Sequence, residues 1–134
     1  MRRSCGLTHV AMSVPEGTLT EDYRTRVLAF YGGLLGWQEM EELRRPDRLT
    51  IAVGGASYIN LRERPDSAVR LGYEHFGVLV ASATELRALW DELADRDEDV
   101  ELEPLAPNDG GEGSFRFRFL LPFSVEAQYY AALL

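Results

Sequence analysis

The clearest structural signal in the sequence is the run Leu7-Thr8-His9-Val10-Ala11-Met12-Ser13-Val14, together with its partial repeat Tyr73-Glu74-His75-Phe76-Gly77-Val78-Leu79-Val80. Alternating side chains in such a run are typical of a half-buried strand, and each run carries one of the two histidines of the chain. The histidines are 66 positions apart, about half of the 134 residues. Self-similarity at this distance indicates two related modules, each opening with a histidine strand.

The composition narrows the class of protein. A chain of 134 residues with 46% hydrophobic residues can bury one core, and a net charge of −8 argues against a nucleic-acid partner. No apolar run is long enough for a membrane span or a signal peptide. The single cysteine, Cys5, cannot form an intramolecular disulfide, which favours the cytoplasm. All fourteen basic residues are arginines, which excludes lysine Schiff-base chemistry.

The first module has the order βαβββ. Thr18 and Glu21 have the spacing of a capping box and predict a helix that runs to about Leu35. Its apolar stripe is predicted to contain Leu28, Tyr31 and Leu35. The strands predicted after it cover residues 37–43, 49–53 and 58–62.

The second module repeats this order after a linker predicted at residues 64–71. Ser82 and Glu85 predict a second capping box, opening a helix with apolar residues at helical spacing, namely Leu86, Leu89, Trp90 and Leu93. Strands are expected at 73–80, 100–103, 114–121 and 124–130. The Gly- and Asp-rich residues 108–113 suggest a loop that could act as a lid.

Two βαβββ modules with histidines on their opening strands, and the stretch Phe30-Tyr31-Gly32-Gly33-Leu34-Leu35-Gly36-Trp37, resemble the vicinal oxygen chelate superfamily. It includes glyoxalases, extradiol dioxygenases, fosfomycin-resistance enzymes and bleomycin-resistance proteins. The resemblance implies an α+β fold, in which modules 1–66 and 67–134 form one compact domain with a two-sheet, half-open barrel-like cavity. Such a fold does not fix the chemistry.

The resemblance also suggests site residues, because metal-dependent members take ligands from the first and fourth strands of each module. His9 and His75 match the opening-strand ligands, and Asn60 stands on the fourth strand of module one. On the last strand the repeat offset selects Glu126, whereas a local motif match at Leu121-Pro122-Phe123-Ser124 selects Gln128, which we prefer slightly. With Glu126, two histidines and a carboxylate would suit Fe(II), Mn(II) or Zn(II).

Strand parity extends the candidate site. If Phe115, Phe117 and Phe119 pack in the core, Arg116 and Arg118 lie on the histidine face together with residues 126 and 128. We prefer this arrangement because the opposite one would bury unpaired guanidinium groups, which is costly. The alternative for both arginines is a solvated edge. Tyr58 and Tyr73 have the parity of Asn60 and His75, and their rings could stack on a planar ligand.

The function favoured by the sequence is binding of a small molecule, of the bleomycin-resistance type, in which a bulky, partly aromatic compound such as an antibiotic is sequestered without a cofactor. The alternative is a divalent-metal enzyme, glyoxalase- or dioxygenase-like, using His9, His75 and Glu126. Each specific enzyme assignment lacks a required side chain. A glyoxalase needs a carboxylate where Asn60 stands, which cannot accept a proton, and fosfomycin transfer needs a hydroxyl where Ala11 stands. A homodimer is expected from the resemblance.

Overall fold

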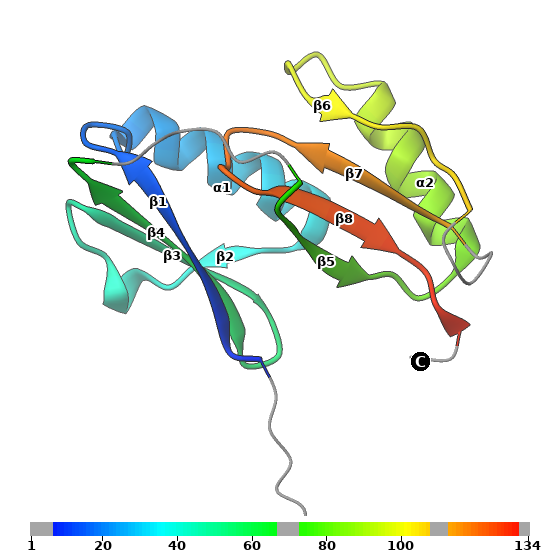
Figure 1. The fold of residues 1–134 in the computed structure, drawn as a ribbon, viewed down its shortest axis with the longest axis horizontal. Helices are drawn as coiled ribbons and strands as arrows, with labels where there is room; N and C mark the ends of the chain where they lie inside the picture. Colours follow the sequence, from blue (N-terminus) through cyan, green and yellow to red (C-terminus); the bar gives the residue numbers. More distant parts are fainter. Residues whose placement is uncertain (1–6, 67–72, 108–112, 132–134) are drawn as a thin grey trace, which may run out of the picture. The chain divides into compact units, whose positions relative to one another are not determined.

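The structure, a computed structural model, describes residues 7–66, 73–107 and 113–131. The chain divides into two compact units, Met1–Arg70 and Leu71–Leu134. Each unit contains a helix and a four-stranded mixed sheet, so the fold is α+β with paired βαβββ modules, as the sequence predicts (Figure 1). The predicted linker and its boundary at residue 66 fall largely on residues 67–72, which lie outside the described residues.

The first unit has the strand order β1-β4-β3-β2. Its elements are β1 (His9–Pro15), α1 (Glu21–Leu35), β2 (Gln38–Glu39), the short 3-10 helix η1 (Glu41–Leu43), β3 (Arg48–Gly54) and β4 (Ser57–Arg64). Strands β1 and β4 pair in parallel, and the remaining pairs are antiparallel.

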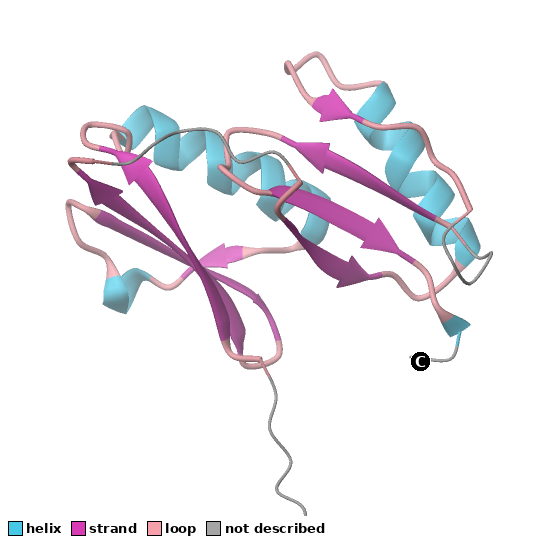
Figure 2. Cartoon of the chain, in the orientation of Figure 1, coloured by secondary structure: helices cyan, strands magenta, loops and turns pink. Residues whose placement is uncertain are grey.

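The second unit repeats this topology with the order β5-β8-β7-β6. Its elements are β5 (His75–Leu79), α2 (Ala83–Ala94), β6 (Glu101–Leu102), β7 (Ser114–Arg118) and β8 (Ser124–Gln128). Strands β5 and β8 pair in parallel, as β1 and β4 do, and the other pairs are antiparallel (Figure 2).

The two sheets share one register as well as one topology. Ala11 pairs with Asn60 in the first sheet, and Gly77 pairs with Glu126 in the second. Both members of the second pair stand 66 positions after those of the first, the same offset that separates the histidines. The repeat seen in the sequence is therefore a repeat of strand pairing.

The helix starts follow side-chain capping. Thr20, not Thr18, caps α1, because its side chain accepts a hydrogen bond from the Tyr23 amide at 3.1 Å. The Thr18 hydroxyl instead donates to the Pro15 carbonyl at 2.6 Å, so the predicted capping box at Thr18 is wrong. The cap predicted at Ser82 is confirmed, since its hydroxyl accepts from the Glu85 amide at 3.0 Å.

The apolar stripe predicted for α1 is correct at Tyr31 but not at Leu28 or Leu35. The buried apolar residues of the helix are Val27, Phe30 and Tyr31, while Leu28 is only half-buried. They complete a core with the side chains of alternate strand positions, namely Met12, Val14, Leu49, Ile51, Ile59 and Leu61. The difference arises because the inward face of the helix begins at a charged residue, Arg24, and continues through Val27 instead of Leu28.

Arg24 is buried in this helix face, with only 3% of its surface exposed. Its guanidinium donates to four main-chain carbonyls, those of Leu19 (3.1 Å), Arg45 (2.7 Å), Pro46 (3.2 Å) and Arg48 (3.2 Å). Buried charge is tolerated where its donors are satisfied in this way. Arg24 thereby ties the chain after η1 to the helix.

The strand predicted through Leu43 is much shorter. Its pairing with β3 ends at Glu39, apart from a hydrogen bond from the Met40 amide to the Thr50 carbonyl at 2.9 Å. The chain then turns into η1, where the Arg44 amide donates to the Glu41 carbonyl. The extended run of residues 37–43 therefore breaks into a short edge strand and a turn.

The second core agrees with strand parity. The buried side chains of β7 and β8 are Phe115, Phe117, Val125 and Ala127, and those of α2 are Leu86, Leu89 and Leu93. The alternate residues of these strands are half-buried and lie on the other face. Among the described residues, no helix is long and apolar enough to cross a membrane.

Candidate ligand-binding site

On the first sheet, His9 lies on the face opposite the core. Met12 and Val14 turn inward, and His9 has the opposite parity along the strand. The ring of His9 stacks on Tyr58, the residue paired with it on β4, with ring centroids 4.9 Å apart and planes 7° apart. Its Nδ1 contacts the Thr8 hydroxyl at 2.9 Å. Two of the predicted site residues, His9 and Tyr58, therefore form one planar platform.

Asn60 lies on the same face, two residues after Tyr58 on β4. Its amide oxygen accepts a hydrogen bond from the buried Thr50 hydroxyl at 3.3 Å. The second lone pair of this oxygen and the amide N–H₂ remain to contact a ligand.

On the second sheet, His75 is held at both ring nitrogens. Nδ1 lies 2.7 Å from the Tyr73 carbonyl oxygen, and Nε2 lies 2.9 Å from Oε2 of Glu126. A carbonyl oxygen only accepts, so Nδ1 carries a proton. The contact between Nε2 and the carboxylate then needs a second proton or a cation between the two atoms, since two lone pairs at this distance repel.

The side chain of Tyr73 extends this cluster. Tyr73 is 77% exposed and meets the His75 ring edge-on, with centroids 5.1 Å apart. The guanidinium of Arg116 lies 5.5 Å from the centre of the Tyr73 ring, and it donates from Nε to Glu103 at 2.9 Å. An exposed aromatic ring backed by a cation is a surface on which a planar compound can stack.

Arg118 continues the row on β7. It donates to Glu101, its neighbour in the pairing with β6. Glu101 and Glu103 are not among the site residues predicted from the sequence, although alternating acidic residues beside alternating arginines in two neighbouring strands are a signal for such pairs. The arginines are thus oriented by carboxylates and do not stand at a purely solvated edge.

The two alignments of the last strand give different environments. Glu126 contacts His75 directly, whereas Gln128 pairs with Leu79 two positions further along the strand. The Gln128 amide nitrogen lies over Gly77, where an added Cβ would be 3.2 Å away. The structure therefore brings Glu126, and not the preferred Gln128, to the histidine.

The donors around His75 provide part of a metal site. His75 Nε2 and Glu126 Oε2 have the chemistry and the separation of two adjacent ligands, and the carbonyl at Nδ1 orients the ring as in many metal sites. Within the described part of the chain, no three His, Cys, Asp or Glu side chains gather around one point. The loop 108–113, considered as a lid, lies outside the described residues except for Gly113.

No protein-family model matches the sequence, and no curated protein is significantly similar to it. Solved structures are similar over nearly the whole chain. The fosfomycin resistance protein FosX from Listeria monocytogenes, solved with Mn(II) and sulfate, has a TM-score of 0.68 at 17% identity, covering 95% of this chain and 91% of that one.

Two further solved structures resemble the chain equally broadly. A glyoxylase/bleomycin resistance protein/dioxygenase domain from Frankia sp. EAN1pec has a TM-score of 0.64 at 24% identity, covering 93% of this chain and 97% of that one. Lactoylglutathione lyase from Agrobacterium tumefaciens has a TM-score of 0.64 at 16% identity, covering 96% of both chains. The predicted resemblance is confirmed: the fold is that of the vicinal oxygen chelate proteins.

Proposed function

We propose that this protein binds a bulky, partly aromatic small molecule, such as an antibiotic, on the histidine-bearing faces of its sheets, and releases it chemically unchanged. The observation that carries the proposal is the exposed Tyr73 ring, flanked by His75 and backed by Arg116. An aromatic ring exposed to this extent gains from contact with a planar ligand.

The neighbouring groups support binding rather than chemistry. His75 is engaged at both nitrogens, Arg116 is paired with Glu103, and Arg118 with Glu101. Groups fixed by such pairs are well placed to orient a ligand. On the first sheet, a flat surface is supplied by the stacked rings of His9 and Tyr58. The Asn60 amide beside them can form hydrogen bonds and carries no charge.

A second candidate is a divalent-metal enzyme with His9, His75 and Glu126 as ligands. It is favoured by one observation, the 2.9 Å approach of Glu126 to Nε2 of a histidine whose Nδ1 is oriented by a carbonyl. Fe(II), Mn(II) or Zn(II) bound there would polarise adjacent substrate oxygens. The amide at Asn60 leaves this ligand set with one carboxylate only, so we expect weak metal binding.

The binding test uses a panel of polycyclic and glycopeptide antibiotics, titrated by calorimetry. We expect Tyr73→Ala to weaken binding at least tenfold and Tyr73→Phe to weaken it less than threefold, because the ring provides the contact. Arg116→Ala should also weaken binding. Arg87→Ala is the matched control, since Arg87 also lies over an aromatic ring, that of Trp90, but on α2. Equal affinity of Tyr73→Ala and the unaltered protein would reject the proposal.

The two candidates are separated by recovering the ligand. Protein and compound are incubated with and without Fe(II), Mn(II) or Zn(II), denatured, and the extract is analysed by chromatography and mass spectrometry. Unchanged mass and retention time support sequestration. Metal-dependent conversion, together with micromolar metal binding that is lost in Glu126→Ala but kept in Gln128→Ala, establishes the enzyme instead.

We also propose that the protein works as a homodimer in the cytoplasm. The single cysteine suits a reducing compartment, and Leu79 offers exposed apolar surface on the same strand as His75. Light scattering coupled to gel filtration measures the mass directly. A mass near 15.1 kDa, that of one chain, would exclude the dimer.

A further inference from the structure

Trp90 on α2 makes a contact that core packing does not require. The buried face of this helix is formed by Leu86, Leu89 and Leu93, whereas Trp90 is half-buried beside them. Its indole Nε1 donates a hydrogen bond to the main-chain carbonyl of Glu103 at 3.0 Å. Glu103 directly follows β6, a two-residue strand at the edge of the second sheet. The indole therefore connects the helix to the outer edge of the sheet.

The main chain of Glu103 is held from two sides. Its amide donates to the Arg116 carbonyl on β7 at 2.9 Å, and its carbonyl accepts the bond from Trp90. These two bonds fix the peptide planes before and after the Cα atom of Glu103. They thereby fix the direction in which the glutamate side chain leaves the main chain.

The carboxylate of Glu103 in turn determines where the guanidinium of Arg116 lies. Arg116 Nε donates to Oε2 of Glu103 at 2.9 Å, and Cζ of the same guanidinium lies 5.5 Å from the centre of the Tyr73 ring. Nε is part of the planar guanidinium, so a bond at this atom orients the whole group. A long arginine side chain without such a partner samples several rotamers.

A neighbouring pair on the same two strands provides an internal comparison. Arg118 also donates through Nε to a glutamate of β6, Glu101. If the indole bond of Trp90 merely held the edge strand in place, its loss would disturb both arginines equally. If the bond acts by directing the Glu103 side chain, its loss disturbs Arg116 much more than Arg118.

We propose that Trp90 is a positioning residue of the ligand site. Its indole N–H holds the Glu103 carbonyl, the Glu103 carboxylate holds Arg116, and Arg116 stays over the exposed Tyr73 ring. Trp90 acts from the helix through these residues and does not touch the ligand. The inference rests on the proposed function for the role of the Tyr73 surface, but the contacts it links can be measured without a ligand.

The measurement is the exchange of the Arg116 Nε–Hε proton with water, followed by NMR of the ¹⁵N-labelled full chain at mildly acidic pH. Arg116→Lys identifies the signal by removing it. Trp90→Phe keeps an aromatic ring but removes the N–H donor, and we expect the Arg116 proton to exchange about threefold faster. Arg87→Ala is the matched control, since it removes the cation 5.3 Å from the centre of the Trp90 ring and leaves the indole N–H in place. It should leave the Arg116 exchange rate unchanged.

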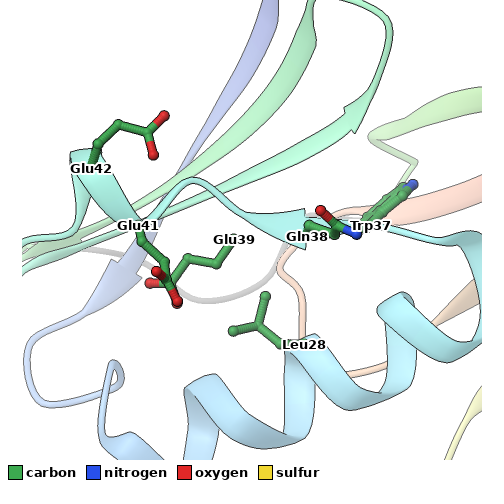
Figure 3. A pocket seen from close by; sticks show the side chains of 6 residues that line it. All are labelled: Leu28, Trp37, Gln38, Glu39, Glu41 and Glu42. Carbon is green, nitrogen blue, oxygen red and sulfur yellow. The ribbon is translucent and has the colours of Figure 1, made fainter.

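The second tryptophan of the chain serves as a reference for the intact fold. Trp37 lies in the first unit, where it lines a pocket together with Leu28 and Gln38 (Figure 3). Its indole signal should keep the same position in every variant.

A double variant then tests whether Trp90 acts through Glu103. Glu103→Ala removes a side chain that is more than half exposed, so the fold should be kept. In this background Trp90→Phe should not accelerate the exchange of Arg116 further, because the intermediate carboxylate is already absent. An unchanged Arg116 rate in Trp90→Phe, equal acceleration at Arg118, or additive effects in the double variant would each overturn the proposal.

Ligand binding is measured separately with the antibiotic panel described above. For a compound that the unaltered protein binds, Trp90→Phe should weaken binding about threefold, and this loss should disappear in an Arg116→Ala background. An equal loss with and without Arg116 would show that Trp90 does not act through this arginine. If Tyr73→Ala leaves the affinity unchanged, the proposed function fails, while the exchange rates still decide the role of Trp90.

Discussion

Replacing Arg24 tests whether one buried guanidinium holds the first unit together. Arg24→Met keeps much of the side-chain volume but removes all four hydrogen bonds to the carbonyls of Leu19, Arg45, Pro46 and Arg48. It also leaves Glu39 with one neighbouring cation where there were two.

The expected loss follows from these contacts. Each hydrogen bond from a charged donor contributes roughly 1 kcal/mol or more net, but Arg45 and Pro46 are exposed, so their carbonyls can regain water. The Leu19 carbonyl belongs to a buried residue and has no such replacement. We therefore expect the free energy of unfolding to fall by about 3 to 4 kcal/mol, and the melting temperature by about 10 to 15 °C.

Urea and thermal unfolding, followed by circular dichroism, measure this loss. Arg24→Lys should recover only a minor part, because an ammonium lacks the planar fork that reaches carbonyls on both sides. Arg62→Met is the matched control: Arg62 is more than half exposed, and its contact with Asp47 at 4.0 Å should contribute little. A loss below 1 kcal/mol in Arg24→Met, or one equal to that of Arg62→Met, would show that the buried guanidinium does not stabilise the first unit.

Three shorter predictions concern stability. Burial raises the pKa of Tyr23 to about 12 from 10. The folded state therefore holds this proton more tightly than the unfolded state, and the free energy of unfolding should fall between pH 10 and 12. Tyr23→Phe should remove this part of the pH dependence in alkaline denaturation, and an unchanged profile would contradict the prediction. Phe117→Ala should cost about 3 to 5 kcal/mol in urea unfolding, because the ring is fully buried, and a cost under 1 kcal/mol would show that the core refills. Gly36→Ala should cost about 1 kcal/mol, since φ is +73° and no atom lies within 4 Å of the added Cβ; a gain in melting temperature would argue against strain.

The sequence was sufficient to predict the architecture, because side-chain alternation, cap spacing and an internal repeat can all be recognised without knowing the contacts. The alternation around His9 and His75 predicted the opening strands, and the capping pair at Ser82 predicted the start of α2. The misplaced cap at Thr18 shows the limit of spacing rules, since Thr18 and Thr20 both precede acidic residues and only the turn from Pro15 decides between them.

The site was predicted less completely. Parity placed Arg116 and Glu126 on the histidine face, but it could not distinguish Glu126 from Gln128, which share that face. The distinction depends on the register between β5 and β8, which is a long-range property of the fold. The buried Arg24 was missed for a related reason: three of its four carbonyl partners lie in a loop more than twenty residues away, and a helical pattern contains no sign of them.

The common register of the two sheets has a consequence for how such a protein can change. Because successive strand residues point to opposite faces, substitutions on the histidine-bearing face leave the inward-facing half of each module untouched. A duplicated segment can therefore acquire unlike chemistry in its two copies while keeping a single scaffold. Asn60 and Glu126 occupy equivalent positions and illustrate this divergence, one as an amide held by a threonine and the other as a carboxylate facing an imidazole. A side chain on one sheet can therefore be placed at the equivalent position of the other sheet without changing the strand pairing.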